Sequence, residues 1–240
     1  MIALLLRHGA DPHRPSPTTG NALLEASVFG NVETATALLK LVPSIRDAAP
    51  TPPFLFTPLN FACIQDKPEY VKWCIDNGIV SDTNNTFGHC SLHAAALQGN
   101  IQNVRLFLAH PELKKRVNVL STPPVIVPGE IAFNVCRLAY RCGAKARPVT
   151  WFTESLHATP LHCAANSNRL SVLAELLNAG ADRTILNGVG ETAGETARRH
   201  GHHTAAEMIE GWGWGASDGW DVLGVHKPSR MPTRGEKRWL

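Results

Sequence analysis

The sequence lacks the long apolar run that a membrane-spanning helix needs. No stretch of its 240 residues approaches the ~18 consecutive apolar positions of a span, so no membrane partner is expected. It also lacks a large excess of charge of one sign. The 23 Lys and Arg against 20 Asp and Glu leave a net charge of +3, which is too small to predict direct nucleic-acid binding.

Motifs of common catalytic sites are missing as well. The sequence contains no Gly-rich phosphate loop, no G-x-S-x-G nucleophile turn and no paired carboxylates at a plausible site. Its six cysteines lie singly, which predicts small reduced core residues rather than a disulfide framework. Reduced thiols are typical of a cytoplasmic or nuclear protein. Neither an enzymatic activity nor a cofactor is expected.

The most informative feature of the sequence is a helix start at residues 159–165, Thr-Pro-Leu-His-Cys-Ala-Ala. Thr159 suits the N-cap, where its hydroxyl accepts a hydrogen bond from a first-turn N–H. Pro160 suits the first helical position, which needs no N–H donor. Leu161 is expected to be buried, and the two alanines leave a thin helix face that a neighbour can approach closely. The stretch therefore predicts a helix built for stacking.

This helix start recurs along the chain. Equivalent starts lie at Asn21, Thr57, Cys90, Thr159 and Thr192. Their spacings are 36, 33, 69 and 33 residues, and a further Thr-Pro pair at 122–123 falls inside the 69-residue gap. A period near 33 residues predicts a series of similar units that bury their apolar faces by stacking on one another.

Other positions of the units repeat too. The fifth residue after each start is small: Ala26, Ala62, Ala95, Ala164 and Ala197. The ninth is of a type that tolerates a positive φ and ends helices: Gly30, Asp66, Gly99, Asn168 and Gly201. The seventeenth and eighteenth predict the buried side of a second helix: Leu38-Leu39, Cys74-Ile75, Phe107-Leu108 and Leu176-Leu177. Each unit is thus expected to be a helix–turn–helix.

A period near 33 with a T-P-L-H-x-A core resembles the ankyrin repeat. The resemblance implies an all-α fold, an ankyrin-repeat solenoid of stacked helix–turn–helix units with finger loops, in one array over residues 1–210. It implies a half repeat at 1–11 and about six repeats, at 12–48, 53–85, 86–117, 118–154, 155–187 and 188–210. The remaining residues 211–240 form a Gly- and Trp-rich basic tail that is expected to be disordered.

Two parts of this array are expected to be irregular. Residues 1–11 resemble a second helix with no first helix before it. Either the chain is part of a longer protein, or its start is misassigned, or something else covers that helix. The repeat at 118–154 is degenerate, because Pro124 and Pro128 lie where its first helix should run. Its residues 134–144 still predict a good second helix, so we expect it to be one irregular unit of the stack.

Three clusters of histidine and cysteine have the composition of metal or catalytic sites, but the repeat pattern or helix geometry argues against each. His89-Cys90-x-x-His93 has metal-like spacing, and residues 200–203 hold three histidines. In both clusters the repeat pattern already accounts for the residues, so no metal site is predicted. The adjacent His162 and Cys163 point about 100° apart on a helix and do not form a catalytic dyad. The resemblance implies instead that His93 and His162 are structural, bonding locally and to the next repeat.

Ankyrin repeats usually bind partners across a concave face made of finger tips and first helices. The resemblance therefore implies partner contacts at these positions: Phe54, Phe56, Phe87, His89, Ser155, Leu156, Ile64, Gln65, Leu97, Gln98, Asn166 and Ser167. We expect a non-catalytic protein–protein interaction scaffold or adaptor that binds protein partners, with a transcriptional co-regulator as one form of it. The alternative is a regulatory ankyrin fragment of a larger multidomain enzyme.

Overall fold

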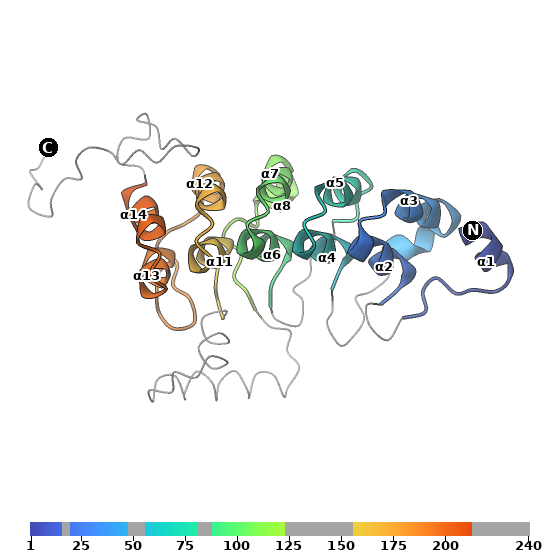
Figure 1. Cartoon of the computed structure of the whole chain (residues 1–240), viewed down its shortest axis with the longest axis horizontal. Helices are drawn as coiled ribbons and strands as arrows, with labels where there is room; N and C mark the ends of the chain where they lie inside the picture. Colours follow the sequence, from blue (N-terminus) through green and yellow to red (C-terminus); the bar gives the residue numbers. More distant parts are fainter. Residues whose placement is uncertain (16–19, 48–55, 81–87, 123–155, 213–240) are drawn as a thin grey trace, which may run out of the picture.

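The computed structural model describes residues 1–15, 20–47, 56–80, 88–122 and 156–212 (Figure 1). All regular secondary structure in these residues is helical, as predicted. The α-helices are α1 (Ile2–Arg7), α2 (Ala22–Phe29), α3 (Val32–Leu41), α4 (Pro58–Ile64), α5 (Pro68–Asp76), α6 (Ser91–Gln98), α7 (Ile101–Ala109), α8 (Pro111–Lys114), α11 (Pro160–Asn166), α12 (Leu170–Asn178), α13 (Ala193–Arg199) and α14 (His203–Gly211). A 3-10 helix, η1 (Pro43–Asp47), follows α3.

Most of these helices form consecutive pairs: α2 with α3, α4 with α5, α6 with α7, α11 with α12, and α13 with α14. A short turn joins the two helices of each pair, and one residue in each turn has a positive φ. These residues are Gly30 (68°), Asp66 (52°), Gly99 (85°), Asn168 (54°) and Gly201 (79°). All five are the ninth residue after a repeat start, so the prediction for this position is confirmed.

The first helix of each pair begins at the predicted capping residue. The side chains of Asn21, Thr57, Thr159 and Thr192 accept hydrogen bonds from the backbone N–H three residues later. Such a bond satisfies a donor that the helix itself leaves unpaired, and its loss typically costs about 1 kcal/mol. At the remaining start, the thiol of Cys90 lies 3.1 Å from Nδ1 of His93.

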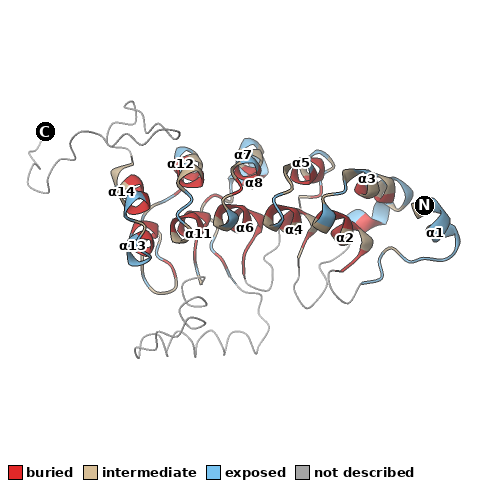
Figure 2. Cartoon of the chain, in the orientation of Figure 1, coloured by how far each residue is buried: buried red, intermediate tan, exposed pale blue. Residues whose placement is uncertain are grey.

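The helix pairs pack side by side in an elongated row (Figure 1). First helices contact first helices in the order α2, α4, α6, α11, α13, and second helices contact second helices in the order α1, α3, α5, α7, α12, α14. The core lies between these two layers, where the buried sides of the helices face one another (Figure 2). It includes the leucines and alanines at the second and fifth positions of the units: Leu23, Leu59, Leu92, Leu161, Ala26, Ala62, Ala95, Ala164 and Ala197.

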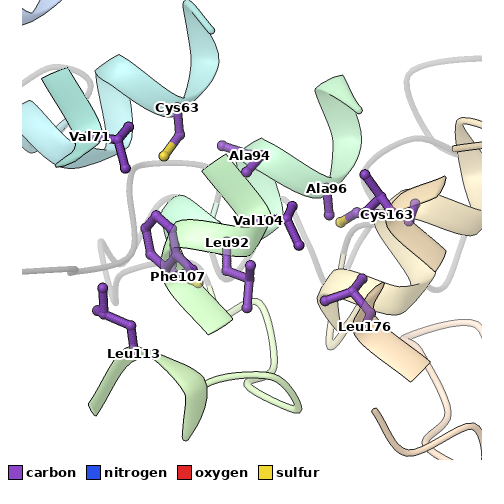
Figure 3. Close-up of a cluster of buried hydrophobic side chains, with 14 of the residues drawn as sticks. Cys63, Val71, Leu92, Ala94, Ala96, Val104, Phe107, Leu113, Cys163 and Leu176 are labelled. Atoms are coloured by element: carbon purple, nitrogen blue, oxygen red, sulfur yellow. The ribbon is translucent and has the colours of Figure 1, made fainter. Parts of the chain in front are cut away.

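The middle of the core combines large and small side chains (Figure 3). Phe107 of α7 is fully buried, and Leu92 of α6 and Leu113 of α8 belong to the same cluster. Truncating a buried aromatic to alanine typically costs about 3–5 kcal/mol. Within the described residues Cys63, Cys74, Cys90 and Cys163 are buried and carry free thiols. The prediction that these cysteines lie in the core is therefore confirmed.

The order of stacking differs from the prediction between residues 118 and 158. Helix α6 packs directly on α11, and α7 packs on α12. Small facing side chains such as Ala96 and Cys163 let the first helices approach one another (Figure 3). The unit at 86–117 is therefore followed in space by the unit at 155–187, and the prediction of a degenerate repeat stacked between them is wrong.

The backbone on either side of residues 123–155 is brought together. The N–H of Ser121 donates to the carbonyl oxygen of Ala158 at 2.8 Å, and the N–H of His157 donates to that of Ser121 at 3.0 Å. The stretch at 134–144, which predicted a second helix, lies outside the described residues. The described backbone that ends at Thr122 and the described backbone that begins at Leu156 are thus neighbours in the stack.

Helix α1 lies at the end of the row of second helices. It contacts α3, and no first helix lies beside it among the described residues (Figure 1). Leu4 and Leu5 are 58 % and 52 % exposed as a result. None of the helices in the described part of the chain is both long and apolar enough to cross a membrane.

Candidate functional site

The candidate site is a strip along the row of first helices. It comprises the seventh and eighth residues after each repeat start: Val28, Phe29, Ile64, Gln65, Leu97, Gln98, Asn166, Ser167, Arg199 and His200. We call it the first-helix surface. Each of its residue pairs lies at the C-terminal end of a first helix, and first helices contact one another from α2 to α13. The side chains of Phe29, Gln65, Gln98 and His200 are exposed, so a partner can reach the strip along most of the row.

The chemistry of the first-helix surface changes along the row. The seventh residue of the units is, in chain order, Val28, Ile64, Leu97, Asn166 and Arg199. Ile64 and Leu97 are partly buried and pack against the core, so only part of each side chain is available to a partner. On α4 the ring of Phe61 adds apolar area, in edge-to-face contact with Phe56 at a centroid distance of 5.0 Å. The seventh position is therefore apolar in the N-terminal half of the surface and polar in the C-terminal half.

Charged groups at the C-terminal end of the surface are paired within the chain. Nε of Arg199 donates to both carboxylate oxygens of Glu191, at 2.8 and 2.9 Å. Arg198, the preceding residue, forms an ion pair with Glu210. Because these charges offset one another, this end offers hydrogen bonds to a partner rather than a strong field of one sign.

Two histidines connect neighbouring first helices beneath the surface. The backbone N–H of Cys90 donates to Nδ1 of His93, whose Nε2 lies 2.8 Å from the carbonyl oxygen of Ala158. In the next unit the N–H of the capping threonine donates to Nδ1 of His162, whose Nε2 lies 3.1 Å from the carbonyl oxygen of Glu191. A backbone N–H can only donate and a carbonyl only accept, so both rings are neutral with the proton on Nε2. The structural role expected of the two histidines is confirmed.

Burial makes these rings hard to protonate. Desolvation lowers the pKa of His93 to about 3 and the pKa of the neighbouring His89 to about 4. It also lowers the pKa of His162. A second proton on His93 would place an N–H against the donating N–H of Cys90, which adds to the cost. The rings therefore act as fixed hydrogen-bonding groups that hold adjacent units together.

The segment around α11 and α12 matches a known family. The family model named Ankyrin repeat matches residues 157–188. This segment is an ankyrin repeat, as the sequence resemblance predicts. The match spans the capping Thr159, the bridging His162 and both helices of the unit. Ankyrin repeats are generally non-catalytic modules that bind other proteins, so this unit is an interaction module.

The structure describes nine of the twelve residues that the ankyrin resemblance assigns to partner contacts. Six lie on the first-helix surface: Ile64, Gln65, Leu97, Gln98, Asn166 and Ser167. Phe56 and Leu156 are partly buried in the loops that lead into α4 and α11. Phe54, Phe87 and Ser155 lie outside the described residues. Partner binding by these residues stays a prediction.

His89 is the exception among the predicted contacts. The resemblance places it at an exposed finger tip, but the residue is only 7 % exposed. Its ring stacks on that of His93 with centroids 5.4 Å apart, and its carbonyl oxygen accepts a hydrogen bond from Nδ2 of Asn60 at 3.2 Å. Since His89 directly precedes the capping residue Cys90, it turns inward against the first helices. Its assignment to the exposed surface is wrong.

Two residues of the N-terminal half of the surface, and Phe61 beside it, are missing from the predicted set. Val28 and Phe29 occupy the same two positions of their unit as Ile64 and Gln65 do in the next. Phe61 lies three residues before Ile64 on the same helix. Counting seven and eight residues from Asn21 would have found the first two, because the repeat start of that unit is recognisable without Thr or Pro.

Proposed function

We propose that the chain is a non-catalytic scaffold or adaptor that binds protein partners across the first-helix surface. In this proposal the five helix pairs are repeats of one ankyrin array, and α1 is the half repeat at its end. The observation that carries the proposal is the run of partly exposed apolar side chains in two consecutive units, Phe61, Ile64 and Leu97. Apolar side chains that recur on one exposed strip favour association with another protein.

The partner would present unlike groups to the two halves of the surface. Apolar side chains of the partner would pack on α4 and α6, where Phe56 and Phe61 add aromatic area. Uncharged polar groups would face α11 and α13, since the arginines there are engaged by Glu191 and Glu210. A partner that is apolar at one end and polar at the other would thereby bind in a single orientation along the row.

The buried thiols favour a reducing compartment for this activity. Burial raises the pKa of Cys74, and it raises that of Cys163 to about 12, so neither forms a reactive thiolate at neutral pH. We propose a cytoplasmic or nuclear location on this ground. A co-regulator or a regulatory part of a larger enzyme would use the same surface.

Site-specific photocrosslinking tests the proposal. A photoreactive amino acid is placed at Gln65 or Gln98, which are exposed on first helices, and as a control at Gln102, which is exposed on the second helix α7. Partners should crosslink from Gln65 and Gln98 and not from Gln102, with unchanged melting curves for all three chains. Equal crosslinking from Gln102, or none from the first helices, would overturn the proposal.

A paired substitution then measures affinity for a partner so found. Gln65→Glu combined with Gln98→Glu places two charges on the surface without removing a core contact, because both side chains are exposed. We expect binding to weaken at least tenfold, whereas Gln102→Glu should leave it unchanged.

A further inference from the structure

A groove of about 430 Å³ opens at the N-terminal end of the row. Three helices line it: α1 with Ile2, Leu5 and Leu6, α2 with Ala22, Glu25, Ala26 and Phe29, and α3 with Thr34 and Leu38. Its floor is mostly apolar, and Phe29 at its edge is 75 % exposed. Among the described residues, four of the seven large apolar side chains that are exposed lie at this end: Met1, Leu4, Leu5 and Phe29. The groove shares Phe29 with the first-helix surface but none of its other lining residues, and the inference drawn from it does not rest on the function proposed for that surface.

The rest of the row indicates what shape fits this groove. Each later first helix packs on the first helix before it, as α4 does on α2 and α6 does on α4. Second helices reach the same neighbour: the hydroxyl of Tyr70 in α5 donates to the carbonyl oxygen of Leu23 in α2 at 3.1 Å. The groove lies on the N-terminal side of α2 and α3, where the first helix of a preceding unit would pack. It therefore continues an interface that the chain makes four times within the described residues, from α2 to α13.

Only half a unit fits there. The second-helix place beside α3 is already taken by α1, which contacts it directly. Docking the far end of another copy would bring α14 together with α13, because the two helices pack as a pair, and α14 would then overlap α1. The vacant place thus suits a single helix rather than a second copy stacked end to end.

A row of polar side chains defines the direction of that helix. In three units the residue before the second helix bonds to a C-terminal carbonyl of the preceding first helix. Asn100 donates to Cys63 at 2.6 Å, Arg169 donates to Leu97 at 3.4 Å, and Nε2 of His202 lies 3.1 Å from the carbonyl oxygen of Asn166.

Lys67 at the same position approaches the preceding turn instead. A Cβ added to Gly30 would lie 2.8 Å from Cδ of Lys67, so the lysine side chain crosses directly over that turn. Every later unit thus uses this position to cover the end of the helix before it.

Asn31 holds this position at the groove. Its Oδ1 accepts a hydrogen bond from the N–H of Thr34 at 2.8 Å, so its amide nitrogen is the atom that remains to donate. A helix in the groove would satisfy that donor if its C-terminal carbonyls lay at Asn31. The last turn of a helix has four carbonyls without partners inside the helix, which makes it the matching acceptor.

We propose that this groove binds a two-turn α-helix of a partner protein, oriented like α2, with its C-terminal end at Asn31. Its buried side carries Leu and Ala three residues apart. This is the spacing of Leu23 and Ala26 in α2, which are 1 % and 4 % exposed. The small alanine permits close approach to Ala22 and Ala26, and the leucine occupies the space beside Leu5 and Leu6.

The proposal is tested by supplying such a helix in the full chain. Gly9 and Gly180 occupy the same position of their units, so residues 159–171 joined directly to Met1 restore a first helix with its capping Thr159. Amide hydrogen exchange over residues 2–7 should slow at least tenfold, and the melting midpoint should rise. The matched control is the same extension carrying Leu161→Asp in the added copy, which should give neither effect.

Asn31→Asp removes the proposed hydrogen-bond donor without removing the oxygen that caps α3. An aspartate keeps the oxygen that caps α3, so the free chain should be as stable as before. It cannot donate, and its charge repels helix carbonyls, so the protection gained from the extension should fall at least fivefold. If Asn31→Asp leaves that protection intact, the orientation proposed for the helix is wrong.

A second measurement tests binding without the tether. A fluorescent peptide of residues 157–171, cross-linked between exposed side chains to stabilise its helix, should bind the full chain one to one. Binding should weaken at least tenfold with Phe29→Gln or Asn31→Asp and not with Gln102→Glu. No saturable binding would overturn the proposal, as would sedimentation showing that the chain fills the groove with a second copy of itself.

Discussion

Nε2 of His93 in α6 lies 2.8 Å from the carbonyl oxygen of Ala158, 65 residues further along the chain. This contact joins two units that are separated in sequence by residues 123–155. With the backbone pairing of Ser121 and Ala158, it closes the stack across that interval. The same imidazole accepts from Cys90 in its own unit, so one neutral ring caps a helix and bridges to the next.

The first prediction follows from this closure. Replacing residues 123–155 by Asn-Gly, a pair that suits a tight turn between adjacent backbones, should leave the chain folded. Each halving of a flexible loop lowers its closure cost by about 0.6 kcal/mol, so the free energy of unfolding should stay unchanged or rise. Urea unfolding of the full chain and the deletion variant measures this.

A deletion of equal length provides the control. Removing residues 57–89 takes out the complete α4–α5 pair and both of its interfaces, so the urea midpoint should fall. If the loss of 123–155 lowers the midpoint as much as the loss of 57–89, those residues contribute a stacked unit after all.

The contrast between the two segments shows what the sequence could predict. Local signals determine the helix starts and the turns: a Thr or Asn side chain caps its own helix, and Gly, Asp or Asn takes the positive φ nine residues later. These signals act within one unit, so the prediction was correct wherever the unit was regular. Which unit packs on which is decided by helix faces far apart in sequence, and the apolar pattern at 134–144 gave no indication that α6 meets α11 directly.

The candidate site was predictable to a similar degree. The repeat positions identify Gln65 and Gln98 as exposed, because both lie at the solvent side of a short helix end. They do not predict how deeply the side chains of Ile64 and Leu97 are buried, since this depends on the neighbouring unit. For His89 the outcome depends on stacking with His93, a contact that spacing alone does not define.

The second prediction concerns pH. The pKa of His89 and His93 in the folded chain, about 4 and about 3, lies below the value of about 6.5 expected on unfolding, and that of His162 is lowered too. As the pH falls below about 6.5, these histidines become protonated in the unfolded chain but stay neutral in the folded chain. The stability is therefore complete above that pH and is lost progressively down to pH 3–4, by up to about 1.4 kcal/mol per pH unit for each histidine.

Urea unfolding at pH 7.5, 6, 5 and 4.5 checks this dependence. His93→Gln keeps a side chain that hydrogen-bonds but removes the titration, so the slope below pH 6 should decrease by about 1.4 kcal/mol per pH unit. An unchanged slope in this variant would show that His93 is not among the groups responsible.

The third prediction concerns helix capping. Thr159→Ala removes the hydroxyl that accepts from the N–H of His162 and contacts its Nδ1 at 2.8 Å. The variant should lose about 1 kcal/mol of stability, as N-cap threonines typically do. Cys90→Thr gives the equivalent start in α6 a stronger cap and should be neutral or stabilising. Urea melts of both variants measure the difference, and effects of the same sign and size would contradict the assignment of the two residues to one repeat position.

The last prediction concerns how far a defect spreads along the row. Tyr70 is fully buried, and its hydroxyl donates to the carbonyl oxygen of Leu23 in the neighbouring pair. Tyr70→Phe should cost about 1 kcal/mol, because a buried hydrogen bond is lost while the ring still fills its place. Units of such an array couple mainly to their neighbours, so hydrogen exchange should quicken in α2 to α5 and stay unchanged in α13 and α14. A uniform increase in exchange from α2 to α14 would mean instead that the described helix pairs unfold as one cooperative block.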